Sequence, residues 1–229
     1  YFSDLDILAL RYHWHITYIS KSACTVVDYK LVPQDRLSPS CLDWNRRLAN
    51  YLSGVAPFDL IINSNSTLVH DGDPNVAVAY KTIVQTQLSR GTQWLVIHDN
   101  PKPELGFVEC IRKDRATAQT RCAIPYEIAM TPSDPLPASI QDLPGVTVAD
   151  FHSIFCPNEM CPPLIDGIRV YLDNSHVFNV FTRFLFGAVD QSIPEKFRNV
   201  QRISRNDASV SIDMAQTFGA TSRGTAVTS

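Results

Sequence analysis

The stretch that decides the fold is Phe58-Asp-Leu-Ile-Ile62, an apolar run that leads into the polar cluster Asn63-Ser-Asn-Ser66. Asp73-Pro74 then begins a helical apolar pattern that reaches Gly91, and a second apolar run, Gln93-Trp-Leu-Val-Ile97, follows. Proline directly after an aspartate is typical of a helix start. Short apolar runs that alternate with helices are typical of strands buried on both faces of a parallel sheet. We therefore expect an α/β fold with a mostly parallel, doubly wound sheet.

The alternation extends in both directions from this stretch. Upstream, the patterns predict a helix over 1–12, a strand over 15–19, and a helix that Ser40 caps and that ends near Gly54. Downstream, 101–144 is a long excursion rich in proline and cysteine, and a segment of that length is expected to be functional or held by disulfides. Beyond 101, the patterns predict a short helix over 123–130, strands over 146–149 and 168–171, and a helix over 177–189.

The hydrophobic periodicity fades near position 190, after which Ser, Thr, Arg, Asn and Gly dominate. We expect one domain over 1–190 and a poorly ordered tail over 191–229. The chain starts at Tyr1 inside an amphipathic pattern, so we also expect further sequence upstream.

The composition narrows the class of protein. The net charge is −3 with no run of basic residues, which disfavours a nucleic-acid partner. No apolar run approaches the roughly 20 residues that span a bilayer. A metal-dependent hydrolase using His13, His15, His98 or His152 is disfavoured, because His13 and His15 lie at a predicted helix-to-strand junction with no acid paired at ligand spacing. No metal and no other cofactor is predicted.

The six cysteines fall along the sequence as three neighbouring pairs. Six cysteines allow 15 pairings, and local pairing is the simplest proposal. Disulfides would imply an oxidising compartment. A zinc site and reduced cysteines buried in the core remain alternatives. The neighbouring pairs are Cys24 with Cys41, Cys110 with Cys122, and Cys156 with Cys161.

The turn Asp173-Asn-Ser-His176 carries the clearest chemical signal. An acid three residues before a histidine can hold one imidazole tautomer and stabilise the imidazolium, as a triad requires of its acid and base. A histidine that merely caps or packs a helix is the common alternative.

Other polar residues are predicted to lie near this turn. Ser64, Asn65 and Asp99 follow predicted strands, as does the turn itself. Ligands of open parallel sheets bind outside the carboxyl ends of the strands, so we expect these residues at one edge of the sheet. For Asp99, an Asp-Asn-Pro turn is an equal alternative.

The chain also resembles a known family over about residues 1–189: the SGNH domains fused to the C-terminal side of membrane-bound acyltransferase-3 proteins, which O-acylate bacterial cell-envelope glycans. The motifs are specific in their order. They are Lys21-Ser-Ala-Cys24, Cys41 with Trp44, Phe58-Asp-Leu-Ile-Ile62, Asp99-Asn-Pro101, Val108-Glu-Cys110 with Cys122-Ala-Ile-Pro125, Cys156-Pro with Cys161-Pro, and Tyr171-Leu-Asp173-Asn-Ser-His176.

The resemblance implies a three-layer α/β/α, flavodoxin-like fold of the SGNH-hydrolase type and Ser-His-Asp chemistry. His176 matches the family's base and Asp173 its acid, while Ser64 and Asn65 best match oxyanion-hole positions. In such an enzyme, Asp99 would shape the acceptor site. It also implies an acyl donor, a glycan acceptor, an N-terminal transmembrane acyltransferase domain in the same protein, and a location on the extracytoplasmic face of the membrane.

One departure matters for function: the family's Gly-Asp-Ser-His nucleophile block occurs nowhere in the 229 residues. We expect that block just ahead of Tyr1, so residues 1–229 alone should be inactive and should expose a sheet edge. The alternative is an inactive binding or scaffolding module with the same fold.

Overall fold

The computed structural model describes residues 2–33, 36–67, 73–130 and 133–198. Its central sheet has three parallel strands, β1 (Leu60–Ser64), β2 (Gln93–Ile97) and β4 (Val146–Ala149), in the order β1-β2-β4. The register pairs Leu95 with Ile62 on one side and with Thr147 on the other. The predicted parallel α/β sheet is confirmed, with the first strand starting two residues later than expected.

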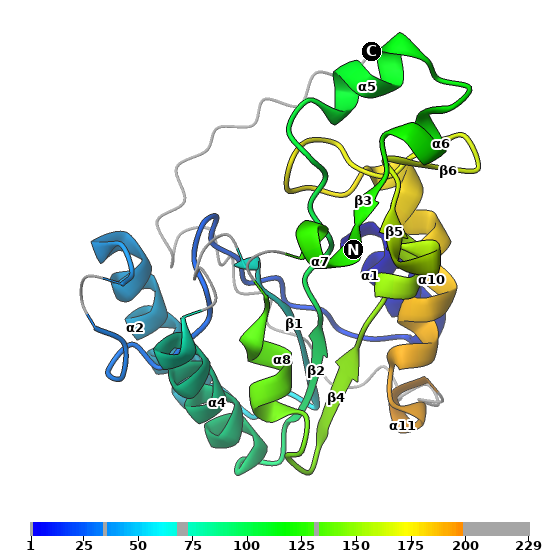
Figure 1. Ribbon diagram of the computed structural model, residues 1–229. Helices are drawn as coiled ribbons and strands as arrows, with labels where there is room; N and C mark the ends of the chain where they lie inside the picture. The colour runs from blue at the N-terminus through cyan, green and yellow to red at the C-terminus, as the bar shows by residue number, and fades with distance from the viewer. Residues whose placement is uncertain (1, 34–35, 68–72, 131–132, 199–229) are drawn as a thin grey trace, which may run out of the picture.

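Helices cover both faces of this sheet (Figure 1). One face carries α2 (Pro39–Gly54), α4 (Pro74–Leu88) and α8 (Pro135–Ile140), and the other carries α1 (Phe2–Tyr12) and α10 (Asn179–Ser192). Alternate residues of β2 serve the two cores, since Trp94 and Val96 pack with the first set while Leu95 and Ile97 pack with the second. The fold is therefore the three-layer α/β/α arrangement that the family resemblance implied.

The starts of the two longest helices on the first face follow from capping chemistry. Asp73 Oδ1 accepts a hydrogen bond from the backbone N–H of Asn75 at 2.8 Å, as the Asp-Pro start of α4 predicts. The predicted cap of α2 was wrong. Ser38 is the capping residue and accepts from Cys41 N at 3.2 Å, because Pro39 takes the first helical position.

The predicted strand over 15–19 does not form. Residues 14–20 run without regular structure, and among the described residues β1 pairs with β2 alone. Trp14 and Ile16 still pack against the α1/α10 core, and Ile19 packs against the opposite core. The apolar residues of this segment are thus partly buried on alternate sides. A strand also needs a neighbouring strand to bond its backbone N–H and C=O groups, and none pairs with this segment among the described residues. β1, whose only neighbour among the described strands is β2, is half-buried rather than buried on both faces as predicted.

The predicted strand over 168–171 is also not part of the parallel sheet. β7 (Ile168–Arg169) pairs antiparallel with β6 (Leu164–Ile165) through a two-residue turn. Asp166 and Gly167 in that turn have φ of 50° and 75°, and Asp-Gly favours a turn in which both central residues have positive φ.

The excursion after β2 folds into short elements joined by disulfides. All six cysteines are paired in the predicted local pattern, which removes the zinc and reduced-cysteine alternatives. The predicted helix over 123–130 forms only over Tyr126–Ala129, and Ile124–Pro125 just before it pair antiparallel with Met160–Cys161. The excursion contains α5 (Phe107–Lys113), α6 (Ala118–Arg121), β3 (Ile124–Pro125) and α7 (Tyr126–Ala129), followed by α8. After β4 come α9 (His152–Phe155), η1 (Pro157–Glu159) and β5 (Met160–Cys161).

The ordered chain continues past the predicted boundary at position 190. α10 ends at Ser192, Ile193 is buried, and α11 (Glu195–Arg198) follows. Trp14 Nε1 donates to Phe197 O at 2.8 Å, which ties α11 to the segment after α1. The rest of the predicted tail, 199–229, lies outside the described residues. Within the described ranges, no helix combines the length and apolarity needed to cross a membrane.

Candidate functional site

The predicted acid and base lie on a hairpin formed by residues 170–178, which we call the dyad hairpin. Leu172 N donates to His176 O at 2.8 Å, and Phe178 N donates to Val170 O at 2.8 Å. Tyr171 and Val177 form an antiparallel bridge between the two arms. The turn between them is therefore held by backbone hydrogen bonds on both sides.

Asp173 and His176 contact each other directly in this turn. The His176 Nδ1 atom lies 2.8 Å from Asp173 Oδ2 and 3.0 Å from Oδ1. Asp173 Oδ1 also accepts the backbone N–H groups of Ser175 and His176, each at 2.8 Å. The Ser175 N–H, followed by the His176 ring and backbone N–H, holds the pKa of the Asp173 carboxyl well below its usual range. Asp173 is thus ionised at neutral pH.

This geometry determines what His176 can do. A carboxylate only accepts hydrogen bonds, so the neutral imidazole carries its proton on Nδ1 and presents Nε2 as a proton acceptor. Within the described ranges, the ring's hydrogen bonds all involve Nδ1, and 72% of the side chain is exposed. Ser175 Oγ is also near Nδ1, at 3.2 Å, so it lies on the acid side of the ring and not at the basic nitrogen.

Asp99, at the carboxyl end of β2, is buried and fully occupied. Its Oδ2 accepts the backbone N–H and the hydroxyl of Thr67 at 2.7 and 2.9 Å. Its Oδ1 accepts Lys102 Nζ at 2.7 Å and Asn100 N at 2.9 Å. These contacts give Asp99 the role of holding the loops after β1 and β2 together.

The two residues predicted for the oxyanion hole lie at the end of β1 but differ in exposure. Ser64 is exposed, and Asn65 is buried. The Asn65 amide accepts Val26 N at 3.2 Å and donates to Asn63 Oδ1 at 2.8 Å. Asn63 Oδ1 in turn accepts the Tyr80 hydroxyl at 3.0 Å. The Asn65 side chain is therefore part of a polar network that fixes the end of β1.

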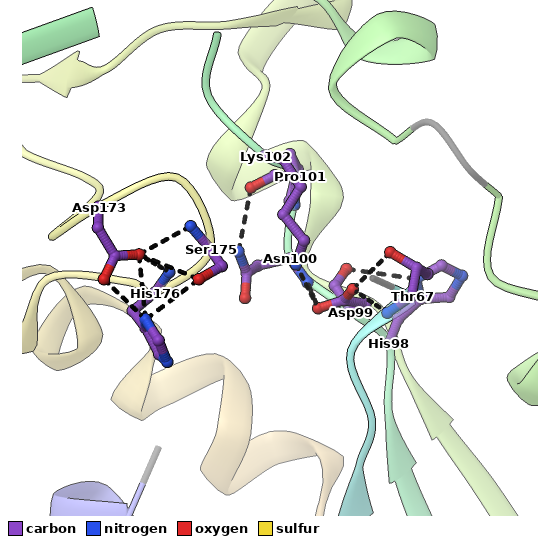
Figure 2. Close-up of polar contacts among 9 residues, drawn as sticks. All are labelled: Thr67, His98, Asp99, Asn100, Pro101, Lys102, Asp173, Ser175 and His176. Carbon is purple, nitrogen blue, oxygen red and sulfur yellow. Dashed lines mark hydrogen bonds and ion pairs between the residues drawn. The ribbon is translucent and has the colours of Figure 1, made fainter. Parts of the chain in front are cut away.

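Figure 2 shows the dyad hairpin and the Asp99 group in one close-up, with Asn100 drawn between them in this view. Contacts through α5 connect the two regions. The Phe107 ring, on the helix that follows the Asp99 loop, meets the Tyr171 ring edge-on with centroids 6.1 Å apart. The dyad hairpin thus packs against the helix that follows the Asp99 loop, although the hairpin does not follow a strand of the parallel sheet.

Sequence reasoning missed two features of this region. Lys102 is paired with Asp99, and its spacing of three residues was the available signal. A second acid–histidine pair follows β4, where His152 Nδ1 lies 3.0 Å from Asp150 Oδ2 and His152 N donates to Asp150 Oδ1 at 2.9 Å. The His152 ring packs on Tyr126 with centroids 4.9 Å apart. Its Asp-x-His spacing after a strand was legible in the sequence.

The geometry of the Asp173–His176 pair is suited to proton transfer. The part of the chain that the structure describes contains no group of three or more His, Cys, Asp or Glu residues arranged to hold a metal ion. An ionised acid, an oriented imidazole and an Nε2 without a hydrogen bond among the described residues are what the acid and base of a Ser-His-Asp triad require.

One comparison with known proteins identifies a family for this chain. The family model described as "SGNH domain (fused to AT3 domains)" matches residues 2–191. Searches among curated proteins and among solved structures gave no match. The matched range includes the whole sheet and the dyad hairpin. With this match and its three-layer fold, the chain belongs to the family of SGNH domains that are fused to AT3 domains.

Proposed function

We propose that this domain transfers acyl groups, most simply acetyl groups, to hydroxyls of cell-envelope glycans by Ser-His-Asp chemistry. The observation that carries the proposal is the contact of Asp173 with His176 Nδ1 at 2.8 Å, on a histidine whose side chain is 72% exposed and whose Nε2 makes no hydrogen bond among the described residues. Family membership supports acyl-transfer or esterase chemistry. The acetyl group and the glycan acceptor rest on the resemblance alone.

In the proposed reaction, His176 Nε2 takes the hydroxyl proton of a serine while the serine oxygen bonds to the acyl carbonyl carbon. The proton passes to the leaving group as the bond to the donor breaks. A glycan hydroxyl then gives its proton to Nε2 and bonds to the acyl carbon, and the departing serine oxygen takes that proton back. Asp173 stays ionised and stabilises the imidazolium in both halves.

We place the nucleophilic serine on a segment of the full-length protein that is not among these 229 residues. The sequence contains no Gly-Asp-Ser-His block. In the described part of the chain, β1 pairs on its β2 side only, which leaves backbone groups for one more strand. A parallel strand there would end at the same sheet edge as Ser64. We further propose Ser64 and the backbone beside it as donors to the oxyanion, and Asp99 as a residue that shapes the acceptor site by holding the loops after β1 and β2 together.

We also propose that the full-length protein contains a membrane-embedded AT3 domain that supplies the acyl group. The SGNH domain described here would lie on the extracytoplasmic side of the membrane. The family description supports the AT3 partner. The three disulfides support an oxidising compartment.

The test uses the full-length protein, with p-nitrophenyl acetate as the acyl donor and a glycan acceptor. His176→Ala is compared with His152→Ala, since both histidines contact an aspartate through Nδ1. We expect His176→Ala to reduce turnover at least about 10³-fold, as removal of a triad base does, and His152→Ala to stay within about threefold.

Three outcomes would contradict the proposal. Equal losses for both variants would remove the special role of His176. Full activity of His176→Ala would favour a binding or scaffolding module. Steady turnover by residues 1–229 alone that is lost on His176→Ala would place the nucleophile inside this chain.

A further inference from the structure

Arg169 contacts the dyad hairpin at the two residues that precede the acid. It lies at the end of β7, and its Nε donates to Tyr171 O at 2.6 Å. Its Nη2 donates to the carbonyl oxygen of Leu172. One guanidinium group therefore bridges two successive carbonyl groups directly ahead of Asp173.

Two aromatic rings hold the same guanidinium. The Arg169 Cζ atom lies 5.3 Å from the centroid of the Phe107 ring and 6.0 Å from that of Phe178, within the range of cation–π attraction. Phe107 is buried on α5, and Phe178 closes the far arm of the dyad hairpin. Arg169 thus joins the start of the hairpin, its end, and the helix after the Asp99 loop.

The Leu172 carbonyl matters because of peptide geometry. The Leu172 C=O and the Asp173 N–H belong to one planar unit, so a donor that fixes the oxygen also fixes the direction in which Asp173 leaves the strand. The opposite arm is set by the bond from Leu172 N to His176 O. The relative position of acid and base therefore depends on the orientation of residues 171 and 172.

We propose that Arg169 is a positioning residue that holds the Asp173 carboxylate against His176 Nδ1. The expected effect of Arg169 on catalysis rests on the proposed function, whereas its effect on the position of Asp173 does not. Lysine cannot replace it, because an ammonium is a point charge without the planar fork that reaches two carbonyl oxygens while lying against two rings.

The test compares Arg169→Ala and Arg169→Lys with Arg115→Ala in the full-length protein. Arg115 is the matched control, since its Nη2 donates to Gly167 O at 3.1 Å in the neighbouring turn. We expect both Arg169 variants to lower kcat for p-nitrophenyl acetate by about 10²-fold, the cost of a small misplacement of catalytic groups. KM should stay within about threefold, and Arg115→Ala should behave as wild type.

Two further measurements separate positioning from a general loss of structure. Added guanidinium ion should restore part of the kcat of Arg169→Ala and none of that of His176→Ala. In ¹⁵N-histidine NMR spectra, with His176 assigned by the His176→Ala spectrum, the wild type should show the tautomer protonated on Nδ1 and Arg169→Ala a mixture of tautomers.

The possible failures are distinguishable. If His176→Ala loses activity while Arg169→Ala keeps both kcat and the Nδ1 tautomer, the positioning role is refuted and the proposed function stands. If His176→Ala is active, the proposed function fails, and the NMR comparison still decides the role of Arg169. An equal loss in Arg115→Ala would also refute the specific role of Arg169.

Discussion

Asp99 and Asp173 make nearly the same contacts but lie in opposite surroundings. Each pairs with a basic side chain three residues later, Asp99 with Lys102 at 2.7 Å and Asp173 with His176 at 2.8 Å. Each also accepts nearby backbone N–H groups and a hydroxyl. The Asp99 and Lys102 side chains are 5% and 11% exposed, whereas those of Asp173 and His176 are 47% and 72% exposed.

The difference shows that hydrogen bonding alone does not identify a functional acid. A substrate cannot reach a buried pair. Removing one partner of such a pair leaves the other charge buried and unpaired, which is strongly destabilising. An exposed pair contributes little to stability because water screens it, and its basic nitrogen can be reached from outside. Mutation should therefore separate stability from activity at the two sites.

The largest expected effect is on catalysis at the exposed pair. Asp173→Asn keeps the size of the side chain but removes the charge that orients and stabilises the imidazolium. We expect the turnover of p-nitrophenyl acetate by the full-length protein to fall about 10³-fold or more. The melting temperature should change by only a few degrees.

The matched control is Asp150→Asn, because Asp150 contacts His152 in the same way. A comparable loss of turnover in that variant would mean that both pairs act in the reaction, which contradicts the assignment.

The next largest effect is on stability at the buried pair. Lys102→Met removes the cation that faces Asp99 Oδ1, and we expect the free energy of unfolding to fall by about 3 to 5 kcal/mol. Chemical denaturation measures this loss. Lys113→Met, at an exposed position on α5, should change it by less than about 0.5 kcal/mol. If Lys102→Met were as stable as Lys113→Met, the buried pair would have no structural role.

A third carboxylate sharpens the comparison, because Asp4 is buried with one oxygen, Oδ2, that has no hydrogen-bond partner among the described residues. Burial raises the pKa of Asp4 above 3.8, against the opposing influence of Thr182 and Arg183. The folded state then holds its proton to higher pH than the unfolded state. The stability that this proton contributes is complete below pH 3.8 and is lost as pH rises through the folded pKa.

Asp4→Asn removes this titration. The unfolding free energy of the wild type relative to Asp4→Asn should therefore decline as pH rises above 3.8, by on the order of 1 kcal/mol, a typical cost of an unpaired buried polar atom. Thermal melts across a pH series measure the difference. If the wild type instead became more stable relative to Asp4→Asn as pH rose above 3.8, the raised pKa of Asp4 would be refuted.

The smallest effect concerns the acid titration of Asp173. Its pKa is lowered in the folded state by the Ser175 N–H and by His176, so its contribution to stability is present above the ordinary value of 3.8 and is lost as pH falls. Because the side chain is half exposed, screening limits this contribution to less than about 1 kcal/mol. The stability difference between wild type and Asp173→Asn should shrink below pH 3.8. A difference that grew there would contradict the lowered pKa.

Features that depend on neighbours in sequence were predictable. β2 and β4 are apolar runs between turn residues, and the contact of Asp173 with His176 lies within one turn. The cysteine pairs are also close in sequence. In each case the partners are near enough for spacing and residue type to carry the information.

Features that depend on distant partners were not predictable. Asp99 is buried because Thr67, 32 residues away, bonds to it. The 15–19 segment has strand-like residues, but whether it forms a strand depends on a neighbouring strand. The antiparallel turn at Asp166-Gly167 is the exception, because its Asp-Gly signal was present in the sequence.

The order of the disulfides has a consequence for biosynthesis. The bonds link cysteines that are 17, 12 and 5 residues apart, and no bond spans another. As a chain emerges end first into an oxidising compartment, each cysteine meets its correct partner before the next pair arrives. Oxidation of the thiols in the order in which they emerge therefore produces the native set, and little thiol–disulfide exchange is needed to repair mispaired bonds. Production of this domain should depend on an oxidant rather than on a disulfide isomerase.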